Sequence, residues 1–339
     1  MRFGVTLYSL TSEYKAGKYT LEELLSLAGE LGVGPGVELV GFQSIRSFPA
    51  VSDQFARRFR RLLDAAGLEP TCLGANVDIG RRRDRLMTDA ETVDYLSAQI
   101  TAAAKLGFPV MRIQFGARPE ALRAIAPVAE AAGVKLGMEI HAPHSVDHPT
   151  VMAVRDLYEE IDSPYLGFIP DFGASARAIP VGAIRQQREL GTSEEIIDLI
   201  TSAWTAAHAG KLDPFAARRD LLEQIRSSGG EAEASAFAWR ALTLWGAQAP
   251  ERWIEIMPRI VHVHGKFFDI DENGDEPSVP YSELMRVFGE AGYKGTISSE
   301  WEGSAWAESP DGFAMVRKHQ DMMRRYLTQD ANQVKQRSL

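Results

Sequence analysis

Short apolar segments recur along the whole chain and alternate with longer segments that have an amphipathic, helical pattern. Because the short segments are almost continuously apolar, we expect them to be strands buried on both faces, as in a parallel sheet. Eight such strands are predicted, at Phe3–Tyr8, Val37–Val40, Glu69–Ala75, Pro109–Gln114, Lys135–Ile140, Leu166–Pro170, Ile260–His264 and Gly295–Ser299.

Helix start signals precede several of the amphipathic segments. Thr20-Leu-Glu-Glu23 and Thr88-Asp-Ala-Glu91 are capping boxes, in which the first and last side chains satisfy the free amides of a helix start. Further helices are expected at about 119–132, 150–161 and 311–327. Regular alternation of strand and helix predicts a (β/α)₈ TIM barrel, here as a single domain covering residues 1–339.

The segment between the sixth and seventh strands breaks this regularity. Ser175 to Pro258 is too long for one crossover and has several helical patterns, so we expect a helical insertion at 175–258. It carries four tryptophans, at positions 204, 239, 245 and 253. This apolar and indole content exceeds what a crossover needs, which predicts a surface for a partner chain.

Composition and charge exclude some classes of function. The 339 residues are 45% hydrophobic and have a net charge of −9, which argues against nucleic acid as a partner because such binding relies on Lys and Arg. The single cysteine, Cys72, excludes an internal disulfide and suits a reducing compartment. The start has no signal-peptide pattern, and no apolar run of about 18 residues occurs. We therefore expect a cytoplasmic protein without a membrane partner.

Ligand-type side chains stand at the ends of the last four predicted strands. They are Glu139, Asp171, His264 and Glu300. In a barrel these strand ends meet at the catalytic face. Carboxylates within about 4 Å of each other would repel by about 4 kcal/mol per pair at a dielectric near 20, so a divalent cation is expected among them. Three oxygens and one imidazole suit Mn²⁺, our expected ion, with Mg²⁺, Co²⁺ or Zn²⁺ as alternatives.

Two further histidines are candidates for proton transfer. His141 lies two residues after Glu139, so both side chains share one face of the strand, and we expect His141 to be the general base. His144, in the following loop, is the alternative base. Glu139 and Glu300 are expected to take part in catalysis besides binding metal. The predicted substrate-binding residues are His262, Lys266 and Gln114.

Five motifs resemble the xylose-isomerase-like superfamily of sugar isomerases and epimerases. They are Gly-Val-Glu-Leu-Val at 36–40, Met-Glu-Ile-His at 138–141, Pro-Asp-Phe-Gly at 170–173, Val-His-Val-His-Gly-Lys at 261–266 and Ser-Glu-Trp-Glu-Gly at 299–303. The resemblance implies that a metal is held by the same four residues. Sugar epimerases of this group usually carry a histidine where this chain has Ala174, which argues against a standard epimerase.

Within that superfamily, the chain resembles the α subunits of bacterial C-glycoside deglycosidases in the Met-Glu-Ile-His-Ala-Pro-His run, in Pro-Asp-Phe-Gly-Ala and in the long insertion. The resemblance implies a hetero-oligomer with a small β-rich second subunit. It also implies cleavage of the carbon–carbon bond between a 3-oxo sugar and an aromatic aglycone such as a flavonoid. The expected reaction is removal of the C2 proton followed by elimination. The alternative is a metal-dependent sugar isomerase or epimerase that acts through an enediolate.

Overall fold

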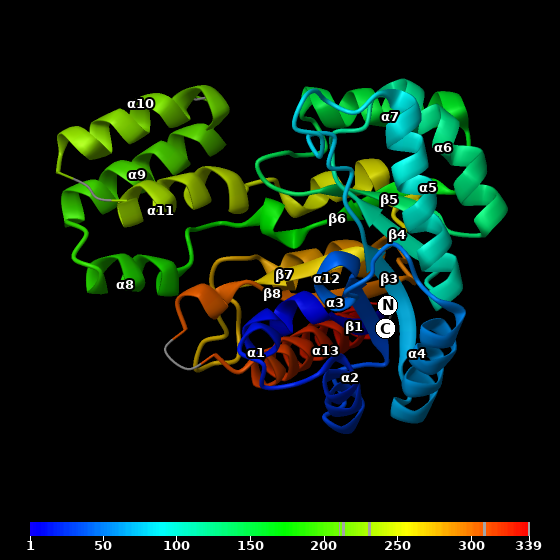
Figure 1. The fold of residues 1–339 in the computed structure, drawn as a ribbon. Coiled ribbons are helices and arrows are strands. Elements are labelled where there is room, and N and C mark those ends of the chain that lie inside the picture. Colours follow the sequence, from blue (N-terminus) through cyan, green and yellow to red (C-terminus); the bar gives the residue numbers. More distant parts are fainter. Residues whose placement is uncertain (210, 212–213, 230–231, 308–309, 338–339) are drawn as a thin grey trace.

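Eight parallel strands form a nearly closed barrel with helices around it (Figure 1), which confirms the predicted (β/α)₈ fold. The computed structural model describes residues 1–209, 211, 214–229, 232–307 and 310–337. Positions 210, 212–213 and 230–231 of the expected insertion lie outside the described residues. The strands are β1 (Arg2–Thr6), β2 (Gly36–Val40), β3 (Glu69–Gly74), β4 (Val110–Ile113), β5 (Lys135–Ile140), β6 (Leu166–Pro170), β7 (Val263–Phe267) and β8 (Thr296–Trp301).

The barrel has one weak seam, between β6 and β7. The hydrogen-bonded ladder runs in the order β6-β5-β4-β3-β2-β1-β8-β7. In the described part of the chain, two isolated bridges, Phe168 to Ile260 and Asp171 to His264, cross this seam in place of a regular ladder. Pro170 lies between the two bridged positions of β6 and has no amide hydrogen to donate. The seam nevertheless brings Asp171 beside His264.

Helices cover the outside of the barrel, with starts and ends that follow the local sequence. They are α1 (Thr11–Lys15), α2 (Leu21–Glu30), α3 (Gly41–Ser44), α4 (Asp53–Ala66), α5 (Asp89–Leu106), α6 (Pro119–Ala132), α7 (Pro149–Ile161), α12 (Tyr281–Glu290) and α13 (Gly312–Arg337). Both predicted capping boxes, at Thr20 and Thr88, are formed. Gly133 ends α6 with a φ of 67° and leads directly into β5. None of the described helices combines the length and apolar composition that a bilayer span requires.

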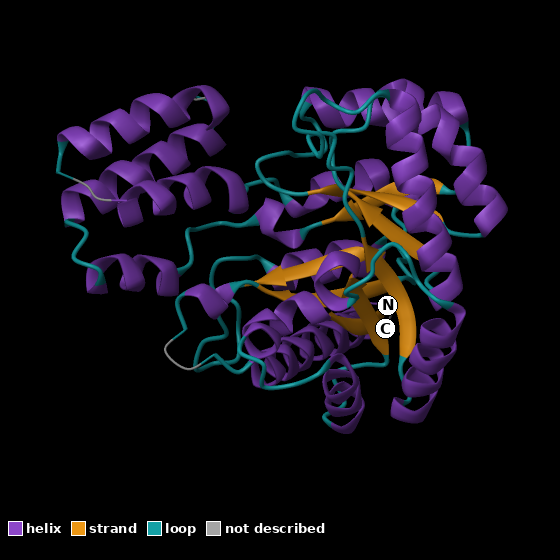
Figure 2. Cartoon of the chain, in the orientation of Figure 1, coloured by secondary structure: helices purple, strands orange, loops and turns teal. Residues whose placement is uncertain are grey.

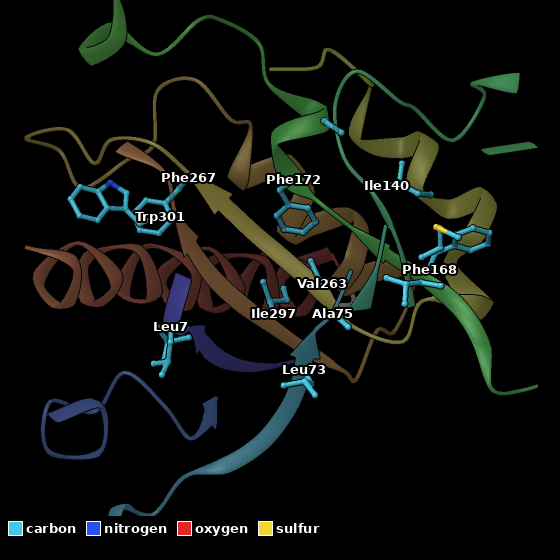
Figure 3. Packing of buried hydrophobic residues seen from close by; sticks show 14 of the residues in the cluster. Leu7, Leu73, Ala75, Ile140, Phe168, Phe172, Val263, Phe267, Ile297 and Trp301 are labelled. Atoms are coloured by element: carbon cyan, nitrogen blue, oxygen red, sulfur yellow. The ribbon is translucent and has the colours of Figure 1, made fainter. Parts of the chain in front are cut away.

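The core lies between the strands and their covering helices (Figure 3). Side chains of Leu73, Ile140, Phe168, Val263 and Ile297 come from five different strands and are fully buried. Burial of this kind stabilises a fold by about 25 cal/mol per Å² of apolar surface. The core therefore fixes the strand ends that carry the polar residues.

The seventh strand begins later than the sequence pattern suggests. A 3₁₀ helix, η3 (Pro250–Arg259), leads into the segment, and the Val261 amide donates to the Phe168 carbonyl across the seam. The regular ladder therefore starts at Val263 instead of Ile260. As a result, His264 lies near the start of β7, and Lys266 is closer to its end.

Between β6 and β7 the described residues form helices and loops (Figure 2). The helices are η2 (Phe172–Ser175), α8 (Val181–Glu189), α9 (Glu194–His208), α10 (Pro214–Ser227) and α11 (Ala232–Leu244), followed by η3. Three of the four tryptophans are buried, and two of them donate inward: Trp204 Nε1 to the Trp245 carbonyl (2.8 Å) and Trp253 Nε1 to Ser175 Oγ (3.0 Å). Only Trp239, 41% exposed, adds indole surface. The indoles therefore serve mainly to hold the segment together.

Candidate metal centre

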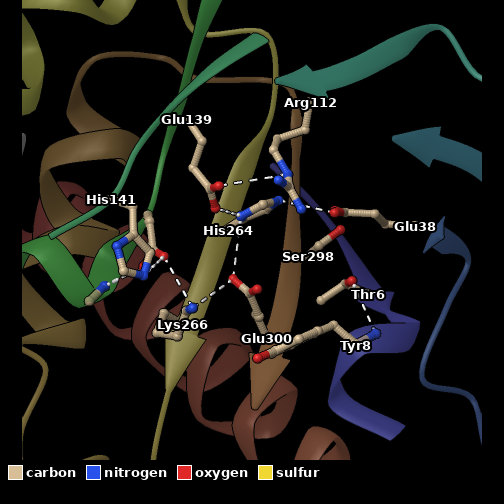
Figure 4. A network of polar contacts seen from close by, with 12 residues as sticks. Thr6, Tyr8, Glu38, Arg112, Glu139, His141, His264, Lys266, Ser298 and Glu300 are labelled. Atoms are coloured by element: carbon tan, nitrogen blue, oxygen red, sulfur yellow. Dashed lines mark hydrogen bonds and ion pairs between the residues drawn. The ribbon is translucent and has the colours of Figure 1, made fainter. Parts of the chain in front are cut away.

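Four acidic and imidazole side chains meet where the last four strands converge (Figure 4). Glu139, Asp171, His264 and Glu300 each present a ligand atom within 4.8 Å of all the others. His264 Nδ1 lies 2.7 Å from Glu139 Oε1 and 3.3 Å from Glu300 Oε2. The structure thus brings together the four residues that we expected to bind metal.

The donor set fits a hard divalent cation. All four side chains are buried, and Asp171 Oδ2 and Glu300 Oε2 accept no well-directed hydrogen bond, although both form an ion pair with Lys266. Burial of a carboxylate oxygen that accepts no hydrogen bond costs free energy of folding unless a positive charge lies beside it. Carboxylate and imidazole ligands are those that Mn²⁺, Mg²⁺ and Zn²⁺ accept. The group can therefore hold a hard divalent cation.

Lys266 places an ammonium inside the same group. Its Nζ is 3.2 Å from Asp171 Oδ2, 3.3 Å from Glu300 Oε2 and 3.1 Å from Glu302 Oε1. Burial disfavours the charged amine, but the three carboxylates outweigh it and raise the pKa of Lys266 well above its usual range. Lys266, predicted as a substrate-binding residue, thus lies among the candidate metal ligands.

Two of the carboxyl groups have opposite electrostatic environments. Burial raises the pKa of Glu300 to about 7, despite the nearby charges of Lys266 and His264. Burial also opposes ionisation of Glu139, but the charges of Arg112 and His264 hold the pKa of this carboxyl well below its usual range. Glu300 therefore does not ionise as readily as Glu139. A bound divalent cation would favour the charged form of both carboxyl groups.

Three residues that the sequence analysis did not single out support the cluster. Arg112 Nε lies 3.7 Å from Glu139 Oε2, and Arg112 Nη1 donates to the Ala75 carbonyl. Glu38 contacts His264 from the opposite side, and although burial opposes its ionisation, His264 and His262 hold the pKa of Glu38 well below its usual range. Tyr8 lies near Glu302, whose charge raises the pKa of the Tyr8 hydroxyl above its usual range. Glu38 and Arg112 could have been noticed in the sequence, because both are charged residues within apolar strands. Such residues are rarely buried without a partner.

His141 lies at the edge of the group, and its side chain is 30% exposed. Its Nε2 is 3.7 Å from Asp171 Oδ2, and its Nδ1 is 2.5 Å from the Ala142 carbonyl oxygen. A carbonyl oxygen can only accept, so Nδ1 carries a hydrogen, and whenever the ring is neutral the lone pair is on Nε2. His144 is part-buried, and its ring contacts Phe115 and His148. Burial, and after it the charge of His148, lowers the pKa of His144 to about 4.

Of the other two predicted substrate-binding residues, His262 lies directly behind the group, with its ring centroid 5.9 Å from that of His264. The fully buried His262 bonds Glu38 and Ser298. It also lines a cavity of about 320 Å³ at the N-terminal ends of the strands, together with Arg2 and Thr296. Gln114 is exposed directly after β4.

Comparison with known proteins first defines the class. Residues 25–188 match the family model described as xylose isomerase-like TIM barrel. The structure of an L-ribulose 3-epimerase aligns with a TM-score of 0.57 and 15% identity, covering 100% of this chain and 98% of that one. A crystal structure of the IOLI protein with a zinc atom aligns with a TM-score of 0.55 and 12% identity, covering 97% of this chain and 99% of that one. Fold and site together thus define a xylose isomerase-like TIM barrel, as predicted.

Curated relatives then narrow the family. The 3'-dehydrocarminate deglycosidase alpha subunit of a Microbacterium species is 44% identical over 329 residues, covering 96% of this chain and 94% of the relative. The C-glycoside deglycosidase alpha subunit of Microbacterium trichothecenolyticum is 41% identical, covering 95% and 89%. The chain therefore belongs to the family of C-glycoside deglycosidase α subunits within this superfamily. Both relatives are named as alpha subunits of deglycosidases.

Proposed function

We propose that the chain is the α subunit of a metal-dependent lyase that cleaves the carbon–carbon bond between a 3-oxo sugar and an aromatic aglycone of the flavonoid type. The observation that carries the proposal is the placement of His141 Nε2 at the half-exposed edge of the four-residue ligand group. Glu139, Asp171, His264 and Glu300 would hold the metal, for which Mn²⁺ is our choice.

The chemistry starts beside the ketone. A ketone at C3 acidifies the C2 proton, and a divalent cation would supply Lewis acidity worth several kcal/mol at the neighbouring oxygens. His141 takes the C2 proton on Nε2, because its Nδ1 is committed to the Ala142 carbonyl. A positioned general base of this kind contributes about 10²–10⁴-fold.

Elimination then completes the reaction without an oxidant. The electron pair of the C2–H bond forms a C1–C2 double bond. The pair of the C1–aglycone bond leaves with the ring carbon, which takes up a proton. The products are an unsaturated 3-oxo sugar and the free aglycone.

The position of Ala174 supports cleavage over epimerisation. Ala174 is 1% exposed, and a Cβ added to Gly246 would lie 2.3 Å from the Ala174 carbonyl oxygen. The backbone at Gly246 is therefore packed directly against residues 173 and 174. The Gly246 amide donates a hydrogen bond to the Gly173 carbonyl. The imidazole that sugar epimerases place at this position is missing.

We also propose that a small β-rich subunit binds the helical insertion. Val181, Leu190 and Trp239 are 63%, 55% and 41% exposed on α8, the loop after it and α11, and an apolar surface of this kind favours a protein partner. The full chain, with and without the product of a neighbouring small gene, should be examined by light scattering. A stable monomer with full activity would contradict the partner proposal.

The experiment for the activity uses the same two preparations. Each is incubated with Mn²⁺ and a 3-oxo-C-glucosyl flavone, and release of the flavone is followed by chromatography. Free 3-oxo-glucose and free ketoses are assayed in parallel. Flavone release supports the lyase. Conversion of the ketoses without flavone release would favour the sugar isomerase or epimerase instead.

A further inference from the structure

Glu38 joins the candidate metal centre to the interior of the barrel. Its Oε1 lies 3.1 Å from His264 Nε2, and its Oε2 lies 3.1 Å from His262 Nε2. Ser298 Oγ lies 3.0 Å from the same His262 nitrogen. Glu38 is 1% exposed, so both of its oxygens are committed to imidazoles inside the barrel. None of these contacts involves the surface of the protein.

An irregularity in the sheet lies beside Glu38, in the neighbouring strand β3. The register between β2 and β3 shifts after Val37, which pairs with Pro70, so that Glu38 pairs with Cys72 and Thr71 is left over. Thr71 Oγ1 donates to the Val37 carbonyl (2.9 Å), which replaces part of the interrupted ladder. Such bulges re-aim side chains and occur often beside active sites.

The contacts of Glu38 also determine which nitrogen of His264 can bind a metal. A carboxylate can only accept hydrogen bonds, so the imidazole nitrogen that faces it must carry a hydrogen. That nitrogen is His264 Nε2. Nδ1 also faces carboxylates, those of Glu139 at 2.7 Å and Glu300 at 3.3 Å, so without an ion it carries a hydrogen as well. A cation held by Glu139 and Glu300 would take the place of that hydrogen, whereas the hydrogen on Nε2 stays bonded to Glu38. Glu38 thus selects both the tautomer and the rotation of the ring.

We propose that Glu38 is a positioning residue that orients His264 so that Nδ1 binds the metal, while His262 and Ser298 hold the other half of the Glu38 contact network. The inference rests on the metal site of the proposed function. Partners that bond the second nitrogen of a metal-binding histidine fix its orientation and raise its basicity, and their loss typically weakens metal binding 10–100-fold.

The test measures metal affinity rather than activity. Mn²⁺ is titrated into the full chain, and the free ion is quantified by electron paramagnetic resonance. Glu38→Gln keeps the shape of the side chain but turns an amide NH₂ towards one imidazole, so we expect Mn²⁺ binding to weaken about 10–100-fold. Glu38→Ala should weaken it at least as much. The visible absorption of Co²⁺-loaded protein should also shift in Glu38→Gln, since the imidazole ligand changes.

Glu13→Gln is the matched control, because Glu13 is also a buried carboxylate but bonds the Gly312 amide at the start of α13. It should bind Mn²⁺ within twofold of wild type and leave the Co²⁺ spectrum unchanged. Circular dichroism and thermal melting verify that each variant is folded. A folded Glu38→Gln protein with wild-type Mn²⁺ affinity would overturn the positioning role alone. A wild-type chain that binds no Mn²⁺ would overturn the metal site, and this inference with it.

A crystal structure of the wild-type chain with Mn²⁺ tests the same point without any substitution. Nδ1 of His264 on the ion, with Nε2 within hydrogen-bonding distance of Glu38, is the expected result. Coordination through Nε2, or a ring turned away from Glu38, would contradict the proposal even if the Glu38 variants do not fold.

Discussion

The ammonium of Lys266 lies 3.3 Å from the carboxylate of Glu300 inside the barrel. A side-chain cation thus shares the carboxylates with any metal. Lys266→Met leaves Asp171 and Glu300 without this counter-charge, and removing one partner of a buried ion pair costs about 3–5 kcal/mol. We expect the free energy of unfolding, measured by urea titration in the presence of EDTA, to fall by that amount. Addition of Mn²⁺ should then raise the free energy of unfolding more in the variant than in wild type.

Lys105→Met is the control for Lys266, because Lys105 pairs with Asp53 on the surface, where both side chains are exposed. It should change stability little and should not alter the response to Mn²⁺. If Lys266→Met behaves as Lys105→Met does, the ammonium does not neutralise the cluster.

Loss of two ligands should abolish metal binding. Glu139→Ala combined with Asp171→Ala removes two of the four candidate ligands, so metal analysis after mild purification should fall from about one equivalent to a small fraction. Circular dichroism should confirm that the double variant is folded. Full metal content in that variant would contradict the ligand assignment.

Metal affinity should depend on pH around neutrality. Burial raises the pKa of Glu300 to about 7, and Glu38, Glu300 and Glu139 outweigh burial to raise the pKa of His264 well above its usual range. Both groups must lose their protons before they can bind a cation. Affinity should therefore fall as the pH is lowered from 8 to 6, by up to about tenfold per pH unit for each proton released.

Calorimetry in two buffers with different ionisation enthalpies counts the protons that metal uptake releases. We expect at least a fractional release at pH 7. A constant affinity across this range, with no proton release, would show that Glu300 is already ionised in the folded protein.

His141→Ala should lower turnover by about two to four orders of magnitude, because a general base is lost, while metal content stays near wild type. Solvent deuterium incorporation at C2 of a 3-oxo sugar reports proton removal even if bond cleavage stalls. His144→Ala is the matched comparison, since His144 lies in the next loop. If His141→Ala exchanges the proton at the wild-type rate, the base is His144 or Glu300.

The fold could be predicted from local patterns where the chain marks its own boundaries. Strands β5 and β6 have the predicted limits, because Gly133 ends the preceding helix and Pro170 ends the ladder. The start of β7 could not be predicted, since Ile260 is apolar and differs from a ladder residue only through its distant partner, Phe168. Periodicity carries no information about that contact.

The residues of the candidate site also differ in whether they could be predicted from the sequence. Residues at strand ends, such as Asp171 and Glu300, could be predicted because topology alone brings them together. Glu38 and Arg112 act from within their strands, and their roles depend on side chains more than 25 positions away. The motif around Glu38 is visible in the sequence, but nothing in its local pattern indicates a contact between Glu38 and His264.

The seam between β6 and β7 has a consequence for how this protein family can diversify. The chain leaves the barrel after Pro170 and returns at Ile260, on the two sides of the one joint between described strands that lacks a regular ladder. A helical unit of any length can be gained, lost or exchanged there without breaking the sheet. Asp171 and His264 face each other across the same joint. Changes in this one part of the fold can therefore alter both the subunit interface and the reaction.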